Sequence, residues 1–103
     1  MALTKFGFIV TGKDLDPAMH RMTMASRNFT MIAIGVPHPE QGIQVACDMV
    51  ADGVQLLELC GGFGPIWTAK ILDAVGRKIP VGSVAYGPES IDAMHALFRD
   101  SAS

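Results

Sequence analysis

Four of the six prolines divide this sequence into segments of similar length. Pro17, Pro39, Pro65 and Pro88 each follow an apolar run and precede a stretch with helical periodicity, and they are spaced 22, 26 and 23 residues apart. Proline suits the first turn of a helix, because its missing N–H would have no partner there and its φ angle is already helical. The spacing therefore predicts a strand, a turn and a helix repeated four times, with each helix beginning at or close to its proline.

The apolar runs have the composition expected of buried strands. They are rich in β-branched, aromatic and aliphatic residues, and the second run is apolar at positions that would face both sides of a sheet. Strands that are apolar on both faces are typical of parallel sheets covered by helices. The four predicted strands are Lys5–Thr11, Phe29–Val36, Val54–Leu59 and Ile79–Tyr86.

Three of the four predicted helices have a clear apolar face. The exception is the segment from Pro17 to about Ser26, in which Met19, Met22 and Met24 do not share one helical face. The apolar faces consist of Ile43, Ala46, Cys47 and Val50 after Pro39, of Ile71, Leu72 and Val75 after Pro65, and of Ile91, Met94 and Phe98 after Pro88.

Four β-α units with short connections predict an α/β fold, with an all-parallel sheet flanked by helices and joined by right-handed crossovers. The 103 residues are enough for one domain, spanning residues 1–103. An open three-layer sheet is the expected arrangement. The alternative is half of a β/α barrel, because eight such units close a barrel.

The charge pattern and the apolar runs exclude two classes of protein. The chain has 8 basic and 10 acidic side chains and no cluster of Lys and Arg, so we expect no binding to nucleic acid. The longest apolar stretch, Phe29–Val36, is far shorter than the roughly 20 residues of a membrane-spanning helix, and the N-terminus lacks the features of a signal peptide. We therefore expect a soluble, cytoplasmic protein that does not bind membranes.

The cysteines and histidines give no sign of a metal centre. Cys47 and Cys60 are too few and too far apart for a disulfide framework or a zinc site, so both are predicted to be free thiols. The three histidines do not have the spacing of metal ligands. We predict no metal and no cofactor.

The apolar content is high for a domain of this size. Half of the residues are hydrophobic, and seven are methionine. A small domain has much surface to cover with polar side chains, so an apolar surplus indicates burial against another chain. We therefore expect a homo-oligomer.

A ligand site is expected where the strands end and the helices begin. In a parallel α/β sheet these ends share one edge, and the helix N-termini carry unpaired N–H groups and partial positive charge that favour an anion. The residues expected to bind ligand there are Thr11, Gly61, Gly62, Phe63, Gly64, Tyr86, Glu89 and Ser90, and those expected to act in catalysis are Glu58, His38 and Cys60.

The segment from Glu58 to Pro65 has three glycines in four positions, at Gly61, Gly62 and Gly64. Glycines allow a ligand to approach backbone N–H groups without meeting a Cβ, but a tight turn also requires them for its geometry alone. The segment has neither the Gly-Lys-Ser/Thr of a nucleotide-binding P-loop nor the G-x-G-x-x-G spacing of a dinucleotide site. Both interpretations remain open, anion binding and a tight turn.

Four other residues at this edge each have two interpretations. Glu58, near the end of an apolar strand, suits general acid or base chemistry or a structural hydrogen bond. Cys60 is either a reactive thiol close to a helix N-terminus or a small buried apolar residue. His38 is a candidate catalyst or an exposed neighbour of a helix cap, and Tyr86 is a ligand donor or a ring that covers the core.

Two motifs carry a resemblance to a known family. They are Glu-Leu-Cys-Gly-Gly-Phe-Gly-Pro at residues 58–65 and Tyr-Gly-Pro-Glu-Ser at residues 86–90. With the opening Lys-Phe-Gly-Phe-Ile strand at residues 5–9, they resemble a small family of uncharacterised bacterial proteins of about this length, classed as a domain of unknown function. The resemblance supports the fold and the location of the site, and it implies no substrate.

The sequence thus predicts a homo-oligomeric α/β protein that binds a small anionic metabolite, and general acid/base catalysis on that metabolite is the enzymatic form of this hypothesis. In this hypothesis Gly61–Gly64 hold the anion, Glu58 transfers a proton, and His38, Tyr86 and Glu89 orient the ligand. The alternative is a non-catalytic interaction or structural module whose apolar surface serves assembly.

Overall fold

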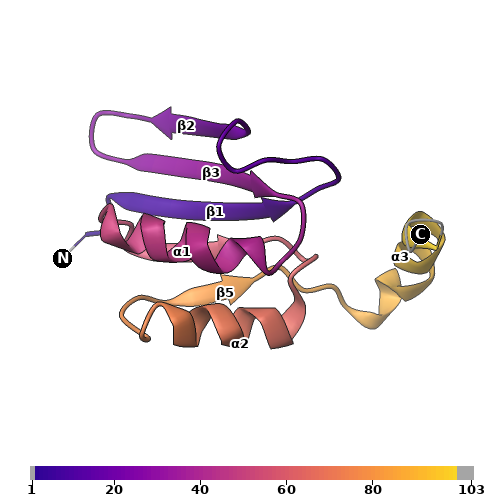
Figure 1. The fold of residues 1–103 in the computed structure, drawn as a ribbon. Coiled ribbons are helices and arrows are strands. Elements are labelled where there is room, and N and C mark those ends of the chain that lie inside the picture. Colours follow the sequence, from indigo (N-terminus) through magenta and orange to yellow (C-terminus); the bar gives the residue numbers. More distant parts are fainter. Residues whose placement is uncertain (1, 100–103) are drawn as a thin grey trace.

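One five-stranded sheet forms the centre of the fold (Figure 1). The computed structural model describes residues 2–99, so the two ends of the predicted 1–103 domain lie outside the described residues. Along the chain the elements are β1 (Lys5–Thr11), β2 (Arg21–Ala25), β3 (Thr30–Val36), α1 (Gln41–Ala51), β4 (Leu56–Leu59), α2 (Gly64–Ala74), β5 (Val81–Ser83), a 3-10 turn (Pro88–Ser90) and α3 (Ile91–Phe98).

The four predicted strands are present as β1, β3, β4 and β5, although β5 covers only Val81–Ser83 of the predicted Ile79–Tyr86, so Tyr86 lies outside it. They lie in the order β3-β1-β4-β5, and each is parallel to its neighbours. In a β/α barrel neighbouring strands follow one another along the chain, whereas here β1 lies between β3 and β4. The half-barrel alternative is therefore wrong, and the sheet is open.

The segment after Pro17 contradicts the prediction. It forms no helix over residues 17–26; instead, residues 21–25 form β2, which is antiparallel to β3 and makes the sheet mixed rather than all-parallel. Met22 and Met24 alternate with the β-branched Thr23, which is a strand pattern, and the amide of Ser26 donates to the carbonyl of Phe29 at 2.8 Å to close the β2–β3 hairpin.

The other three prolines lie close to helix starts, as predicted. Pro65 is in the first turn of α2, which begins at Gly64, and Pro88 begins the 3-10 turn that leads into α3. Pro39 lies two residues before α1, with Glu40 already in helical conformation at the N-cap.

Helices α1 and α2 lie side by side on one face of the sheet, and the buried core lies between them and the strands (Figure 1). Gly7 of β1 is buried under α1, where a Cβ would lie 3.1 Å from the sulfur of Met49. The predicted three-layer sheet, with helices on both faces, therefore has only two layers. The core consists of Ile9, Ile34, Val36, Val45, Ala46, Met49, Val54, Leu57, Leu59, Phe63, Ile71 and Val75.

Within residues 2–99, no helix lies over the opposite face of the sheet, which we call the open face; α3 lies beyond the carboxyl ends of the strands (Figure 1). The residues on this face alternate with those that point to the helices, and the register pairs Phe8 with Ala33 and with Glu58. The open face consists of Phe6, Phe8, Val10, Met22, Met24, Met31, Ala33, Gly35, Leu56, Glu58 and Gly82.

The direction of the crossovers explains why the helices cover only one face. The connections β3-α1-β4 and β4-α2-β5 run in the same direction across the sheet, so right-handed crossovers place both helices on one side. The connection from β1 to β3 runs the other way and would place a helix on the open face. This stretch of chain contains a loop and β2 instead. Leu15, in that loop, packs against Gly12 and Gly35.

The two longest helices, α1 and α2, have 11 residues each. In the part of the chain that the structure describes, no helix has the length and apolar character required to cross a membrane.

Candidate functional site

The carboxyl ends of β1 and β4 form a crevice at the edge of the sheet. These strands are neighbours, but the chain leaves β1 toward β3 and leaves β4 toward β5, in opposite directions. In doubly wound parallel sheets ligands bind in the crevice outside the carboxyl ends of the strands where the connections reverse. Here that position is occupied by Thr11 at the end of β1 and by residues 60–62 after β4.

A cavity of about 470 Å³ lies at this crevice. Its volume is within the range of roughly 300 to 1,000 Å³ that is usual for small-molecule sites. One wall is formed by the ends of β1 and β4, and the other by apolar side chains of α3. The lining residues are Val10, Thr11, Cys60, Gly61, Gly62, Tyr86, Met94, Leu97 and Phe98.

Two backbone amides in the lining have no hydrogen-bond partner among the described residues. The amide of Cys60 donates to Ile9 at 3.1 Å, and the amide of Phe63 donates to the carbonyl of Cys60, also at 3.1 Å. Between them, the N–H groups of Gly61 and Gly62 donate no hydrogen bond to any residue among 2–99. The first turn of α2 follows directly, so these donors lie next to the positive end of the helix dipole.

The thiol of Cys60 is held at the cavity wall by Thr11. The backbone N–H of Thr11 donates to the sulfur at 3.2 Å, and the Thr11 hydroxyl lies 3.2 Å from the same atom. These contacts tie the ends of β1 and β4 together. They give both side chains a fixed position next to Gly61 and Gly62.

Each glycine of the loop also has a local structural reason. Gly64 has a φ angle of +66°, in the left-handed region that favours glycine. A Cβ at Gly62 would collide with the Thr11 hydroxyl, and one at Gly61 would lie 3.0 Å from the Tyr86 ring. The glycines themselves are thus explained by a tight turn, and it is the cavity and the unpaired amides that point to a ligand.

Replacing Gly64 with alanine is expected to lower the free energy of unfolding by about 1 to 2 kcal/mol, because the left-handed conformation is strained for a residue with a Cβ. Nothing lies within 4 Å of the added atom, so the cost comes from the backbone alone. The measurement is urea denaturation. Gly82→Ala is the control, since Gly82 has neither a positive φ angle nor a close neighbour. Equal midpoints for the two variants would contradict the prediction.

The cavity brings together five of the predicted residues, Thr11, Cys60, Gly61, Gly62 and Tyr86. The others do not line it, and their roles stay predictions. Glu58 lies on the open face beside a smaller cavity of about 210 Å³, and Phe63 turns its side chain into the core, where it is 2% exposed. His38 is exposed between β3 and α1, Gly64 begins α2, and Glu89 and Ser90 lie in the 3-10 turn.

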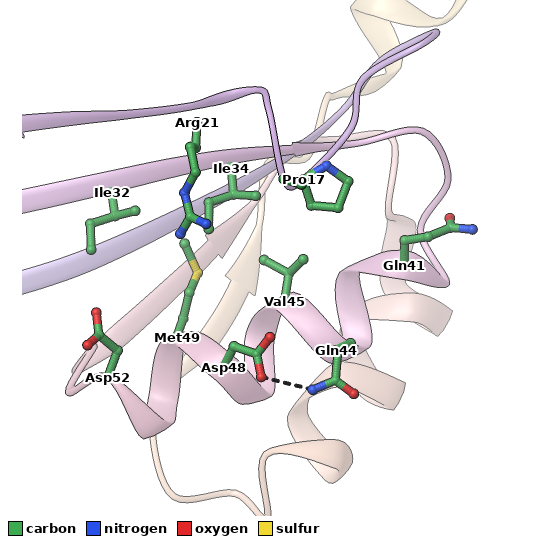
Figure 2. Close-up of a pocket in the computed structure, with 11 residues that line it drawn as sticks. Pro17, Arg21, Ile32, Ile34, Gln41, Gln44, Val45, Asp48, Met49 and Asp52 are labelled. Atoms are coloured by element: carbon green, nitrogen blue, oxygen red, sulfur yellow. Dashed lines mark hydrogen bonds between the residues drawn. The ribbon is translucent and has the colours of Figure 1, made fainter.

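A second cavity, of about 560 Å³, lies between α1 and the β2–β3 hairpin (Figure 2). Its floor is apolar, and its rim is polar, with Arg21 of β2 pointing toward Met49 of α1. A helix over residues 17–26 would leave no such cavity, and the alternation around Thr23 is the sequence signal for the strand that forms its wall. The lining includes Ile32, Ile34, Val45 and Met49 on the floor and Arg21, Gln41, Gln44, Asp48 and Asp52 on the rim.

Among residues 2–99, no group of three or more His, Cys, Asp or Glu side chains has the arrangement of a metal site. The groups in the lining of the first cavity that can donate a hydrogen bond are the two amides, the Thr11 hydroxyl, the Cys60 thiol and the Tyr86 phenol.

Comparison with known proteins assigns the family. Neither the curated proteins nor the solved structures include one that matches this chain. One family model, described as "Family of unknown function (DUF6506)", matches residues 4–99. The match spans every strand and helix described above, together with both cavities. By this match over nearly its whole length, the chain belongs to the family of unknown function DUF6506.

Proposed function

We propose that this protein binds a small metabolite that has an anionic oxygen group and an apolar body, in the cavity at the carboxyl ends of β1 and β4. The observation that carries the proposal is the pair of unpaired amides at Gly61 and Gly62 in the lining of that cavity. Carboxylate and phosphate oxygens are good acceptors for such amides, and the adjacent N-terminus of α2 favours negative charge.

The opposite wall defines the rest of the ligand. Met94, Leu97 and Phe98 of α3 present apolar surface to the cavity, and Val10 adds to it. Inorganic phosphate would leave this surface without a contact. An organic acid with an apolar portion would use both walls, with its charged group at the glycine amides and its body against α3.

The proposal is one of binding, without a proton-transfer step. Glu58, the predicted acid or base, borders a different cavity from the one lined by Gly61 and Gly62. Cys60 is the side chain in the lining with nucleophilic chemistry, and Thr11 holds it in place. The second candidate, a non-catalytic homo-oligomeric module, is favoured by the apolar open face.

A thermal-shift screen tests the proposal. The probes are aliphatic and aromatic carboxylates and their phosphorylated counterparts, each compared with inorganic phosphate. A ligand present at a hundred times its Kd adds about 2.7 kcal/mol of stability, which raises the Tm of a domain of this size by roughly 10 °C. Stabilisation by an organic acid but not by phosphate is expected. No response to any of the probes would favour the module.

Replacing Gly62 with alanine is expected to remove the stabilisation by any acid that the screen identifies. The new Cβ meets the Thr11 hydroxyl, so the loop or Thr11 has to move and the two amides lose their positions. The measurement is the ligand-induced rise in Tm, and Gly82→Ala is the matched control, because Gly82 does not line the cavity and its added methyl group has no neighbour within 4 Å in the single chain. Unchanged ligand affinity in Gly62→Ala would place the site elsewhere.

A further inference from the structure

The open face is apolar, and within the described residues no helix lies over it. The loop after β1 covers one end of it, where Leu15 packs on the buried Gly35; the other residues of the face are half-buried or exposed. Met22 and Met24 are 65% and 67% exposed, and Phe6, which the register aligns with Met31 and Met24, stacks on Phe29 with ring centroids 6.5 Å apart. The largest apolar patch of a monomeric protein is typically about 300 to 600 Å² and is often an interaction site.

The size of the face identifies what can cover it. A rise of about 3.3 Å per residue and a strand spacing of about 4.8 Å give the five strands a projected area of about 400 Å². The protein's own α3 would cover less than a third of this, since eight helical residues span about 12 Å by 10 Å. The open face of a second copy has the same dimensions and the same apolar character.

We propose that the open face is the interface of a symmetric homodimer, in which two sheets pack face to face about 10 Å apart with α1 and α2 on the outside. A two-fold axis brings the same surface of each copy together. The central strands β1 and β3 then contribute Phe8, Met31 and Ala33 to the middle of the interface. The projected area of about 400 Å² compares with roughly 800 Å² of accessible surface buried per partner in a standard interface, so this interface would be at the small end of the range.

The charges agree with this arrangement. Among the described strands, Glu58 is the one charged residue of the open face, and it lies on β4, next to the short edge strand β5. β4, like β3, is one strand from an edge of the sheet, and Glu58 is exposed in the single chain. The flexible methionine side chains of β2 and β3 can adapt to the surface of a second copy.

The experiment is sedimentation equilibrium of the full chain at micromolar concentration, comparing the wild type with Met24→Glu and Thr23→Glu. The wild type is expected at twice the 11.0 kDa mass of one chain. Met24→Glu places two unpaired charges in the apolar interface and is expected to raise the dimer Kd at least about 100-fold. Met24 is mostly exposed in the single chain, so the variant should fold.

Thr23→Glu is the control, because residue 23 lies on the same strand with its side chain on the other face. It is expected to remain a dimer. Circular dichroism of both variants checks that the secondary structure is retained. A monomeric wild type would overturn the proposal. It would also be overturned if Met24→Glu remained a dimer, or if Thr23→Glu dissociated together with Met24→Glu. A monomeric wild type that sediments with lipid vesicles would assign the face to a membrane surface instead.

Discussion

Replacing Phe63 with alanine is expected to lower the free energy of unfolding by about 3 to 5 kcal/mol, the usual cost of removing a buried aromatic ring. The ring is 2% exposed and packs against α1 at Gly42, where a Cβ would lie 2.7 Å from the ring carbon Cε2. The backbone of Phe63 follows Gly61 and Gly62 directly. The ring thus anchors the loop that carries the two unpaired amides, and its loss should also weaken binding of any ligand at the first cavity.

Urea denaturation followed by circular dichroism measures this effect. Phe63→Leu is the control, because it keeps an apolar side chain of similar size and is expected to cost less than about 1.5 kcal/mol. If Phe63→Ala lost less than about 1 kcal/mol, the ring would not be a core residue. The interpretation of Phe63 as a side chain for ligand contact would then regain support.

Replacing Ile71 with alanine is expected to lower the free energy of unfolding by about 2 to 5 kcal/mol. Ile71 is fully buried on α2 and faces Gly42 of α1, so its removal leaves a cavity between the two helices and the sheet. The same substitution at Ile66, which is 69% exposed on the same helix, is expected to change stability by less than about 0.5 kcal/mol.

The two isoleucine variants differ only in position, so helix propensity contributes equally to both. Their denaturation midpoints should therefore separate widely. Similar losses in the two variants would mean that Ile66 is covered by another chain, and a small loss in both would contradict the assignment of the core.

Much of the fold could be predicted because it depends on local patterns. The four apolar runs became β1, β3, β4 and β5, and three of the four prolines lie at or within two residues of a helical start. The exception was the segment with the weakest helical pattern. Its Met-Thr-Met alternation has the period of a strand and favours β2, whereas the spacing of Pro17 from the other prolines favours a helix.

Strand order could not be predicted, because it depends on the direction of each crossover and not on any residue in the strands. The absence of a helix layer on the open face, within the described residues, could not be predicted either. Apolar residues on both sides of β1 and β3 indicated helices on both sides of the sheet, whereas the described chain places helices on one side only. The apolar pattern was informative, but it fits an interface as well as it fits a helix layer.

The edge of the sheet that holds the first cavity could be predicted from topology, and five residues predicted for it line that cavity. The directions in which the side chains of Glu58 and Phe63 point could not be predicted. Leu57 and Leu59 point to the helices, so Glu58 must point away, but in the expected three-layer sheet both directions lead to a helix. Phe63 lies in a turn, where sequence gives no alternation that would indicate its direction.

The central position of β1 determines the order in which the sheet can assemble. β1 is synthesised before the other described strands, yet one of its two partners is β4, which ends at Leu59. During synthesis β1 therefore lacks one of its neighbours until residues 56–59 have emerged. The β2–β3 hairpin is the one strand pairing whose partners are close in sequence, and such local pairs form in about 1 to 10 μs, well before distant strands meet. The short segment that interrupts the repeat of strands and helices thus provides an early template on which β1, and then β4, can align.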